Sequence, residues 1–598
     1  MEISSLTYLA VYSIPGKYTW QVLINFFEGK TKPFMTRIIR RIALKLAALP
    51  RVLKQRQLRQ LLKIAGSLFV ALVVVIYALQ VRAQTISSSS VCALPPVGSI
   101  VKNPPEIRNP DAAHPANFTV VNIAPKQNCY VANGNLQAPT LRMSPGNANL
   151  VVRLTNQLPG QAKGIQDQNC QRQYPGGMAP PNSTNLHFHG LSISSKCHQD
   201  EVVRTVVEPK QTFQYNVSIP QGEPPGLYWY HPHVHMQSQA QVLSGLTGAI
   251  IIEGIGKYNK QAAQLPERVF VLRDTQLLKY FDYQQPARDI SINSVPIRYK
   301  GGGIYDPPAI IQMKPNEQQF WRVANTAADT FFDLQLQYNS IAQPLQLVSM
   351  DGVPINANSQ LQNQTKSVYH ILVPPAGRAE FMIKGPQASV ADAKFLTLKY
   401  NTGAQNYNNP QRTIARIQTQ AASSASASNP ELRVDLTKVS GDRFSGINQN
   451  KPVKQRKLYF SQTAAGVEPE QYYITVEPNK PKVYDPNFKT PDITVQEGTT
   501  EDWIVENRSL VIHTFHIHQI HFLVLNSSDA SEIGMMRDTI NVPIWNGNPN
   551  TPFPSVKLRM DFRGVQNGTS IAGTFVYHCH ILEHEDKGMM ASIEVKRK

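Results

Sequence analysis

Charged residues are scarce in this chain of 598 residues: they make up 17% of it, and only 41 positions are Asp or Glu. Helical bundles use far more Glu, Lys and Ala, so the composition disfavours an all-helical fold. The 44 prolines and 34 glycines instead suit a β-rich chain with many turns. Because domains usually hold about 100–200 residues, three or four domains are expected.

Acidic residues are especially rare near the N-terminus. The formal net charge is +18, and residues 1–83 contain 13 Lys or Arg against 2 Asp or Glu. The remaining chain shows no stripe of basic residues interleaved with stacking aromatics, which a nucleic-acid-binding surface would need. The sequence therefore predicts no nucleic-acid partner.

The basic N-terminal excess belongs to a targeting segment. Five basic residues between Arg51 and Lys63 precede 16 uncharged residues, Ile64 to Leu79, and then Val81-Arg82-Ala83. This order is typical of a secretory signal cut before Gln84. The 63 upstream residues are too many for an ordinary signal, so translation starts later (at Met35, for example) or the segment is an uncleaved membrane anchor. Either alternative predicts an exported protein, periplasmic or extracellular, that meets a membrane only through this segment.

Cysteine is rare, with five residues in the whole chain: Cys92, Cys129, Cys170, Cys197 and Cys579. Four of them lie in the first third of the exported part, and an even number in an oxidising compartment suggests disulfides. Cys170 with Cys197 is the first pairing to expect, because the two flank one loop region. Buried or free thiols remain the alternative.

Past residue 95, short β-branched and aromatic runs alternate with Pro, Gly and Asn, the pattern of β-sandwiches. A short frame occurs three times, as residues 152–156, 321–325 and 503–507, each time ending in Asn after a polar turn. These spacings predict three β-domains of similar plan, at 95–257, 265–420 and 445–598. Residues 421–444 are predicted to be a linker, because 421–428 contain only Ala and Ser.

Ten of the 15 histidines fall into four short clusters, and no histidine occurs between His235 and His370. One His-x-His pair alone is most often coincidence, but four clusters point to metal, for which imidazole is the commonest side-chain ligand. The clusters are His187-Phe188-His189, His231-Pro232-His233, His513-Thr514-Phe515-His516-Ile517-His518, and His578-Cys579-His580 followed by His584 and Met589.

Strand geometry sorts these ligands into two sites. Residues i and i+2 of a strand share one face, so each His-x-His pair directs two imidazoles to one place. Cys579 must then point away from His578 and His580. His513, an odd step from His516 and His518, tends to the other face as well. One site gathers four His-x-His pairs, and the other gathers Cys579, His513 and His584.

Two histidines, a thiolate and a weakly bound methionine describe a blue-copper electron-transfer site. Zinc also accepts two His and a Cys. A structural zinc, however, does not explain eight further imidazoles, nor a thiolate whose two chain neighbours are ligands of the second site. The short covalent path from Cys579 to those ligands favours a redox metal.

These four motifs resemble those of the multicopper oxidases, the family of laccases, bilirubin oxidases and ascorbate oxidase. The resemblance covers about 500 residues, from about 95 to the C-terminus, and implies an all-β fold of three consecutive cupredoxin-like Greek-key β-sandwich domains. It implies four copper ions, with a type 1 copper held by His513, Cys579, His584 and axial Met589. It further implies a type 2 copper held by His187 and His516, and a type 3 pair held by His189, His231, His233, His518, His578 and His580.

Reduction of dioxygen to water consumes four protons, so an acid near the cluster is expected. The run from His580 to Asp586 is similar to that of the spore-coat laccases, where the acid after the last histidine ligand serves the cluster, which makes Glu585 the candidate. Its alternative is an ordinary solvated carboxylate. Asp200 is a weaker candidate and is predicted to be solvated in a loop. His235 and His521 lie near the clusters and are candidates for hydrogen bonds to the metal ligands, whereas His114, His198 and His370 are expected to be surface or core residues.

The resemblance implies a dioxygen-dependent copper oxidoreductase acting on a small reducing substrate. Phenols or related aromatics are the preferred class, with ferrous, manganous or cuprous ions as the alternative. The chain has 13 methionines and no Met-rich insert, which disfavours cuprous ions as the substrate. A metal-free assembly protein of the same fold is the remote alternative, and no ligand is missing to support it.

Overall fold

The computed structural model describes residues 91–145, 149–276, 286–357, 363–403, 409–420, 434–439, 443–464, 466–564 and 570–597. The predicted signal or anchor segment (1–83) and residues 421–433 and 440–442 of the predicted linker lie outside the described residues, whereas residues 434–439 and 443–444 of that linker are described. Residues 86–598 form one compact unit, distinct from residues 1–85. Among the described residues, no helix is long and apolar enough to cross a membrane.

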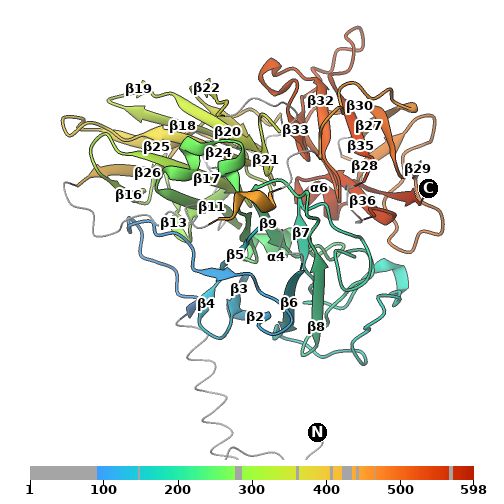
Figure 1. Cartoon of the computed structure of the whole chain (residues 1–598). Coiled ribbons are helices and arrows are strands. Elements are labelled where there is room, and N and C mark those ends of the chain that lie inside the picture. The colour runs from blue at the N-terminus through green and yellow to red at the C-terminus, as the bar shows by residue number, and fades with distance from the viewer. Residues whose placement is uncertain are drawn as a thin grey trace, which may run out of the picture. The chain divides into compact units, whose positions relative to one another are not determined.

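The first third of this unit is a sandwich of two five-stranded sheets around one apolar core, drawn in blue to teal in Figure 1. One sheet has the order β4 (Leu136–Gln137), β3 (Gln127–Ala132), β2 (Ala116–Ala124), β6 (Asn149–Asn156), β8 (Thr212–Ser218). The other has the order β1 (Glu106–Arg108), β5 (Thr140–Met143), β10 (Gly248–Ile252), β9 (Gly226–His231), β7 (His187–His189).

The second sandwich repeats this plan in green to yellow with longer sheets. One sheet has the order β13 (Val295–Ile297), β12 (Arg288–Ile292), β11 (Glu267–Gln276), β17 (Gln318–Asn325), β24 (Arg378–Lys384), β20 (Leu345–Met350), β21 (Val353–Pro354), with β22 (Lys366–Val368) on β20. The other has β16 (Ala309–Met313), β26 (Arg412–Thr419), β25 (Ala393–Leu398), β18 (Phe332–Tyr338), β19 (Ile341–Ala342), with β23 (Ile371–Val373) on β18. A small ribbon pairs β14 (Tyr299–Gly301) with β15 (Ile304–Tyr305).

The third sandwich, in orange to red, holds the C-terminal histidine clusters. One sheet has the order β28 (Tyr472–Val476), β27 (Lys454–Gln462), β30 (Thr499–Asn507), β35 (Ser555–Phe562), β32 (Phe522–Asn526), β33 (Met536–Arg537). The other has β29 (Ile493–Gln496), β37 (Met590–Lys596), β36 (Gly573–Cys579), β31 (His513–Ile517), β34 (Thr539–Val542). The described helices are short: α4 (Ser238–Leu243), α5 (Lys260–Gln264), α6 (Leu582–Asp586), and the 3-10 turns Pro175–Gly177, Ile255–Lys257, Leu436–Lys438 and Ala530–Glu532.

The repeated sequence frame has a structural basis. Its three copies lie on β6, β17 and β30, each a central strand that runs parallel to one neighbour and antiparallel to another. Each strand ends in a fully buried asparagine, Asn156, Asn325 or Asn507, whose amide donates to backbone carbonyls of nearby loops. Each side-chain oxygen accepts a hydrogen bond from the backbone two residues on. The same hydrogen-bonded asparagine therefore ends the corresponding strand in each of the three sandwiches. The all-β, cupredoxin-like fold is confirmed. The exact domain limits stay predictions.

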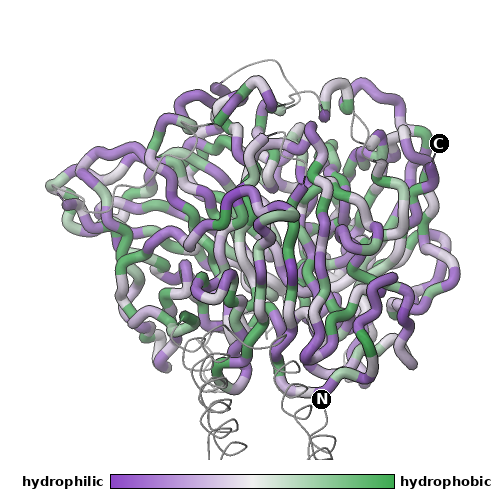
Figure 2. Tube along the Cα trace, turned by 60° about the horizontal axis from the view of Figure 1, so that its bottom comes forward, coloured by the Kyte–Doolittle hydropathy of each residue, from purple (hydrophilic) through white to green (hydrophobic). Residues whose placement is uncertain are grey.

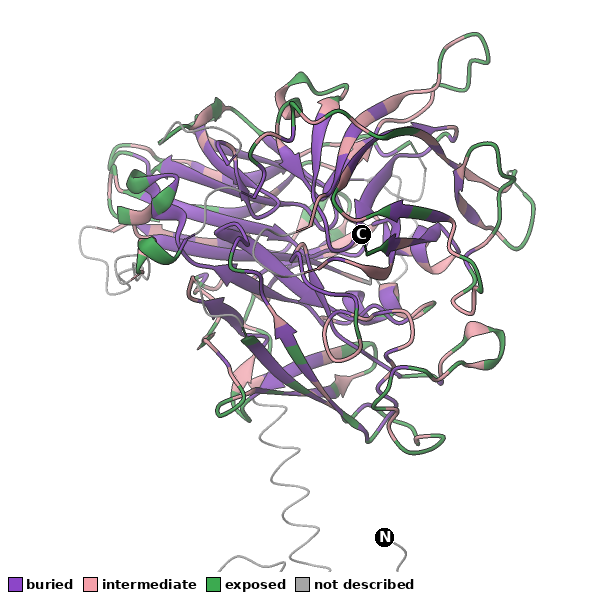
Figure 3. Ribbon diagram, turned by 45° about the vertical axis from the view of Figure 1, so that its right-hand side comes forward, coloured by how far each residue is buried: buried purple, intermediate pink, exposed green. Residues whose placement is uncertain are grey.

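Burial follows the strands in all three sandwiches, with exposed residues concentrated in the connecting loops (Figure 3). Hydrophobic and hydrophilic residues alternate along many strands (Figure 2), as expected where only one face of a sheet meets the core. The first and last sandwiches meet through α4 and α6. Backbone amides of Ser238 and Gln239 donate to the Asp586 carboxylate, and the Leu582 amide donates to Ala328 of the second sandwich.

Candidate metal centre

The histidine pairs lie on two pairs of adjacent antiparallel strands. On β7 and β9 of the first sandwich, His187 stands opposite His231. On β31 and β36 of the third, His516 stands opposite His578. Facing residues on adjacent strands lie within side-chain reach, so each sandwich presents imidazoles from two strands at one edge.

These two edges meet, and the eight imidazoles form one buried cluster. Ligand nitrogens lie within 4.8 Å of one another in three groups, each containing residues from both sandwiches. Stacked rings join the sandwiches directly: the centroids of His187 and His518 are 4.0 Å apart, as are those of His189 and His516. The groups are His187/His189/His516, His189/His231/His580 and His233/His518/His578, with Asp200 beside His187 and His518.

A second group lies inside the third sandwich. The Cys579 sulfur is 3.6 Å from Nδ1 of His513 and 3.6 Å from Nδ1 of His584, and these two nitrogens are 3.1 Å apart. The chain reaches His584 through the turn into α6, which begins at Leu582. Met589 is fully buried in the same apolar core, and its backbone oxygen accepts a hydrogen bond from the Cys579 amide (3.1 Å).

The electrostatics of both groups suit a metal cation. Burial lowers the pKa of His231 to about 3 and of His233 to about 4, so these imidazoles stay neutral and keep a lone pair for coordination. Burial also raises the pKa of the Cys579 thiol to about 12. A thiolate therefore forms there only with a cation to compensate it, which a bound metal supplies.

Unsatisfied nitrogens provide a direct test of fit. Buried polar atoms are normally hydrogen-bonded. Yet Nε2 of His187, His231 and His516, and both ring nitrogens of His189 and His580, have no hydrogen-bond partner among the described residues. Nε2 of His578 faces Nε2 of His233 (3.3 Å) and of His518 (3.2 Å). Ring nitrogens that converge this closely, beside others that lack a partner, suit coordination to a cation, so the residues fit a metal cluster.

Three buried carboxylates stand behind the imidazoles. Both oxygens of Asp200 lie 3.0 Å from Nδ1 of His187, and Asp200 also accepts from the Phe188 amide (2.9 Å) and from Gln519 (2.5 Å). Burial holds the pKa of Asp200 well above its ordinary value. Such carboxylates fix the ring orientation and tautomer of a ligand histidine.

Glu585 is the second carboxylate. It is fully buried, with Oε2 3.0 Å from Nδ1 of His578 and Oε1 3.8 Å from Nε2 of His233. Burial by itself raises its pKa, but the adjacent imidazoles His233 and His578 hold the pKa below the ordinary value. The solvated alternative for Glu585 therefore does not hold.

Comparisons with known proteins agree with this geometry. Two family models described as multicopper oxidase match residues 178–256 and 462–598. A multicopper oxidase mco of Staphylococcus haemolyticus is 25% identical over 481 residues, covering 77% of this chain and 83% of the relative. A laccase of Bacillus subtilis is 21% identical, covering 77% and 89%. The solved multicopper oxidase of Campylobacter jejuni, described as a metallo-oxidase, superposes with a TM-score of 0.58 at 22% identity over 84% of this chain and 96% of that one.

The chain belongs to the multicopper oxidase family. It is therefore a copper-dependent oxidoreductase with dioxygen as acceptor.

Within this multicopper oxidase, several expectations from the sequence meet a clear outcome. The pairing of Cys170 with Cys197 is confirmed, and a second disulfide joins Cys92 to Cys129. The prediction that Asp200 is solvated was wrong. Its loop folds back over the His187–Phe188 backbone, and the carboxylate is 1% exposed.

The five remaining histidines divide as follows. His521 is buried, and its Nε2 donates to the backbone oxygen of Asp351 (3.2 Å). His235 packs edge-on against Tyr484, and His198 stacks on Phe213 at 4.6 Å. His370 is exposed and pairs with Asp333, and His114 is exposed near Asp111.

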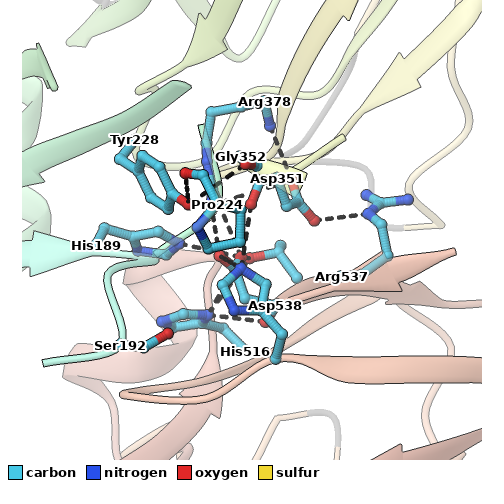
Figure 4. Close-up of polar contacts among 12 residues, drawn as sticks. His189, Ser192, Pro224, Tyr228, Asp351, Gly352, Arg378, His516, Arg537 and Asp538 are labelled. Atoms are coloured by element: carbon cyan, nitrogen blue, oxygen red, sulfur yellow. Dashed lines mark hydrogen bonds and ion pairs between the residues drawn. The ribbon is translucent and has the colours of Figure 1, made fainter. Parts of the chain in front are cut away.

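Sequence reasoning missed the third carboxylate. Asp538 is fully buried, its backbone oxygen accepts from Nδ1 of His516 (2.9 Å), and Oδ1 lies 3.5 Å from Nε2 of His189. Its partner is Arg378 of the second sandwich (Figure 4). The only sequence signal was the pair Arg537-Asp538 in an otherwise apolar stretch, which by itself indicates nothing about a metal site.

Proposed function

We propose that the protein is a laccase-like oxidase. It takes electrons one at a time from phenols or related aromatics at a type 1 copper and reduces dioxygen to water at a trinuclear copper cluster. The observation that carries this proposal is the division of the histidines into one group with a cysteine and three groups made of histidines alone. That division is the one a four-copper enzyme requires.

The proposed ligands follow the groups. His513, Cys579, His584 and axial Met589 would hold the type 1 copper, and His187 with His516 the type 2 copper. His189, His231 and His580 would hold one type 3 copper, and His233, His518 and His578 the other. The bound coppers supply the one-electron steps by which four electrons from the reductant convert dioxygen and four protons into two waters.

The chain's own residues control protons and water at the cluster. Asp200 keeps Nδ1 of His187 protonated and thereby directs Nε2 of that ring inward. Glu585 places Oε1 beside the His233 ring at the edge of the cluster, where it would hand protons to reduced oxygen. All eight imidazoles are at most 2% exposed, so bulk water is excluded from the reacting atoms.

The surroundings of His584 disfavour a metal ion as the reductant. The Tyr472 ring stacks on the His584 ring with centroids 4.1 Å apart and, at 3% exposure, shields it from solvent. The neighbouring carboxylates Glu470 and Glu583 both pair with Lys587, at 2.6 and 2.8 Å. Because a cation substrate needs unpaired carboxylates, this arrangement disfavours ferrous or manganous ions.

Export to an oxidising compartment is part of the proposal. Two disulfides, Cys92–Cys129 and Cys170–Cys197, support it, because structural disulfides are rare in reducing compartments. Whether the basic N-terminal segment acts as a cleaved signal or an anchor can be determined from the N-terminus of the mature protein.

One experiment tests the function. The purified protein is loaded with copper, and the blue absorbance band and oxygen uptake are recorded with a phenol, a ferrous salt and a cuprous salt in parallel. We expect a blue band, four coppers per chain, and fastest oxygen uptake with the phenol. A colourless preparation that consumes no oxygen with any reductant would refute the proposed function. Faster oxygen uptake with ferrous or cuprous ions than with the phenol would identify metal ions as the substrate class instead.

A further inference from the structure

One arginine of the second sandwich reaches the metal centre, although the described residues of that sandwich supply no member of the ligand groups. Arg378 opens β24 and is fully buried. Its Nη1 and Nη2 donate to Oδ1 and Oδ2 of Asp538 in the third sandwich, at 2.8 and 2.5 Å. Its Nε donates to the backbone oxygen of Leu227 in the first sandwich (3.2 Å). A single guanidinium from the second sandwich thus bonds residues of the first and the third; Figure 4 shows Arg378 beside Asp538.

Asp538 connects this guanidinium to imidazoles of both outer sandwiches. Its backbone oxygen accepts from Nδ1 of His516, which leaves Nε2 of that ring for a metal. Its Oδ1 lies 3.5 Å from Nε2 of His189, which leaves Nδ1 of that ring for a metal. Burial alone raises the pKa of Asp538, but the charge and hydrogen bonds of Arg378 hold the pKa below the ordinary value. The carboxylate is therefore an anion, and the two terminal nitrogens of Arg378 hold it in place through a pair of parallel hydrogen bonds.

The surrounding backbone is shaped around this ion pair. Gly190, directly after His189, has φ +88°, and a Cβ there would lie 2.7 Å from Oδ2 of Asp538 and closer still to Arg378. The glycine after the first His-x-His pair is therefore required by the ion pair packed against it. On the other side, Asp351 accepts from the Arg378 amide (2.9 Å) and from Nε of Arg537 (2.6 Å). Asp351 also lies 3.6 Å from Nη1 of Arg378, and the Thr539 hydroxyl donates to Oδ1 of Asp538 (2.7 Å), so each charged group has a second contact.

We propose that the Arg378–Asp538 pair is a positioning element of the trinuclear site, through which the second sandwich sets the ring orientations of His189 and His516. This inference rests on the proposed function. Arg378 and Asp538 touch neither substrate nor metal; they act through the two imidazoles. The type 2 site depends on them most, because only two histidines are assigned to it and one of these is His516.

The test compares Arg378→Gln, Arg378→Lys and Asp538→Asn with a matched control, Arg142→Gln. Arg142 is also buried and also joins two sandwiches, through Glu267, but its partners are carboxylates without an imidazole neighbour. Copper content, the electron paramagnetic resonance signal of the type 2 copper, and the blue band of the Cys579 site are measured on the full-length protein. The blue band serves as an internal standard for folding.

We expect Arg378→Gln and Asp538→Asn to weaken type 2 copper binding about 10- to 100-fold and to change the hyperfine splitting of its signal, with the blue band retained. Arg378→Lys keeps the positive charge but loses the two-nitrogen contact with the carboxylate, so type 2 copper binding should be weakened less than in Arg378→Gln. The control should lose thermal stability and keep its type 2 copper. Unchanged type 2 signal and affinity in Arg378→Gln, or equal copper loss in Arg142→Gln, would overturn the inference. If Arg378→Gln does not fold, Asp538→Asn and Arg378→Lys decide on the same criteria. A wild-type protein without a blue band overturns the proposed function instead.

Discussion

Lys587 offers a way to change the class of reductant that the enzyme accepts. Its ammonium pairs with Glu470 and Glu583 beside the Tyr472 ring that covers His584, and all three charged side chains are between 26% and 42% exposed. Replacing it in Lys587→Gln leaves two carboxylates without their shared cation. A divalent cation about 5 Å from one carboxylate gains about 1.7 kcal/mol in water, and two carboxylates at physiological salt give roughly 1–2 kcal/mol after screening. The KM for ferrous iron should therefore fall about tenfold.

The assay is oxygen uptake of copper-loaded protein with ferrous iron and with a phenol. The phenol kcat/KM should change less than twofold, and the ferrous gain should shrink as salt is added, because the carboxylates are partly exposed. Lys457→Gln is the matched control: Lys457 also lies near two carboxylates, Glu506 at 2.8 Å and Glu477 at 4.0 Å. An unchanged ferrous KM in Lys587→Gln, or the same gain in Lys457→Gln, would refute the reasoning.

Four further outcomes are expected. Tyr472→Ala should shift the blue band and lower the midpoint of thermal unfolding while Tyr472→Phe keeps both, because the buried ring packs on the His584 imidazole; absorbance spectra and thermal melts decide. Asp200→Asn should weaken copper binding about 10- to 100-fold in a chelator competition, since an amide cannot accept every bond that the carboxylate accepts. Opening the Cys92–Cys129 disulfide, which closes a separation of 37 residues, should lower the free energy of unfolding by about 3–4 kcal/mol without altering the blue band. The metal-free protein should lose stability as pH falls below about 6.5: buried imidazoles such as His231, with a pKa of about 3, stay neutral in the native chain while unfolded histidines take up protons, at about 1.4 kcal/mol per pH unit for each. A urea midpoint that is flat from pH 7 to 5.5 would contradict this last expectation.

The sequence predicted what depends on local geometry. Alternation along a strand places His578 and His580 on one face and Cys579 on the other, and no knowledge of the tertiary arrangement is needed for that step. The repeated frame ending in Asn156, Asn325 and Asn507 likewise reflects a local hydrogen-bond pattern at the end of each central strand. Local rules of this kind gave the fold class and the grouping of the histidines.

Contacts between the sandwiches could not be predicted from the sequence. Arg378 and Asp538 are 160 residues apart, and neither has neighbours in sequence that mark it as part of a metal site. Asp200 was judged from its loop position, but burial of a loop carboxylate depends on where the loop folds, here against the Phe188 amide and Gln519. Composition and periodicity describe single elements, so contacts between distant elements leave no trace in them.

The separation of the two metal groups is built into one strand. On β36 and its continuation, His578, Cys579 and His580 are consecutive, so one face directs the thiol into the core of the third sandwich and the opposite face directs both imidazoles toward the first. The register of β36 is fixed on both sides, with Phe515 opposite Cys579 and Met590 opposite His578. A slip by one residue would exchange the two faces and remove the cysteine and both imidazoles from their sites together. Backbone pairing therefore sets the proposed path between electron uptake and dioxygen reduction, and this arrangement should already be present before copper binds.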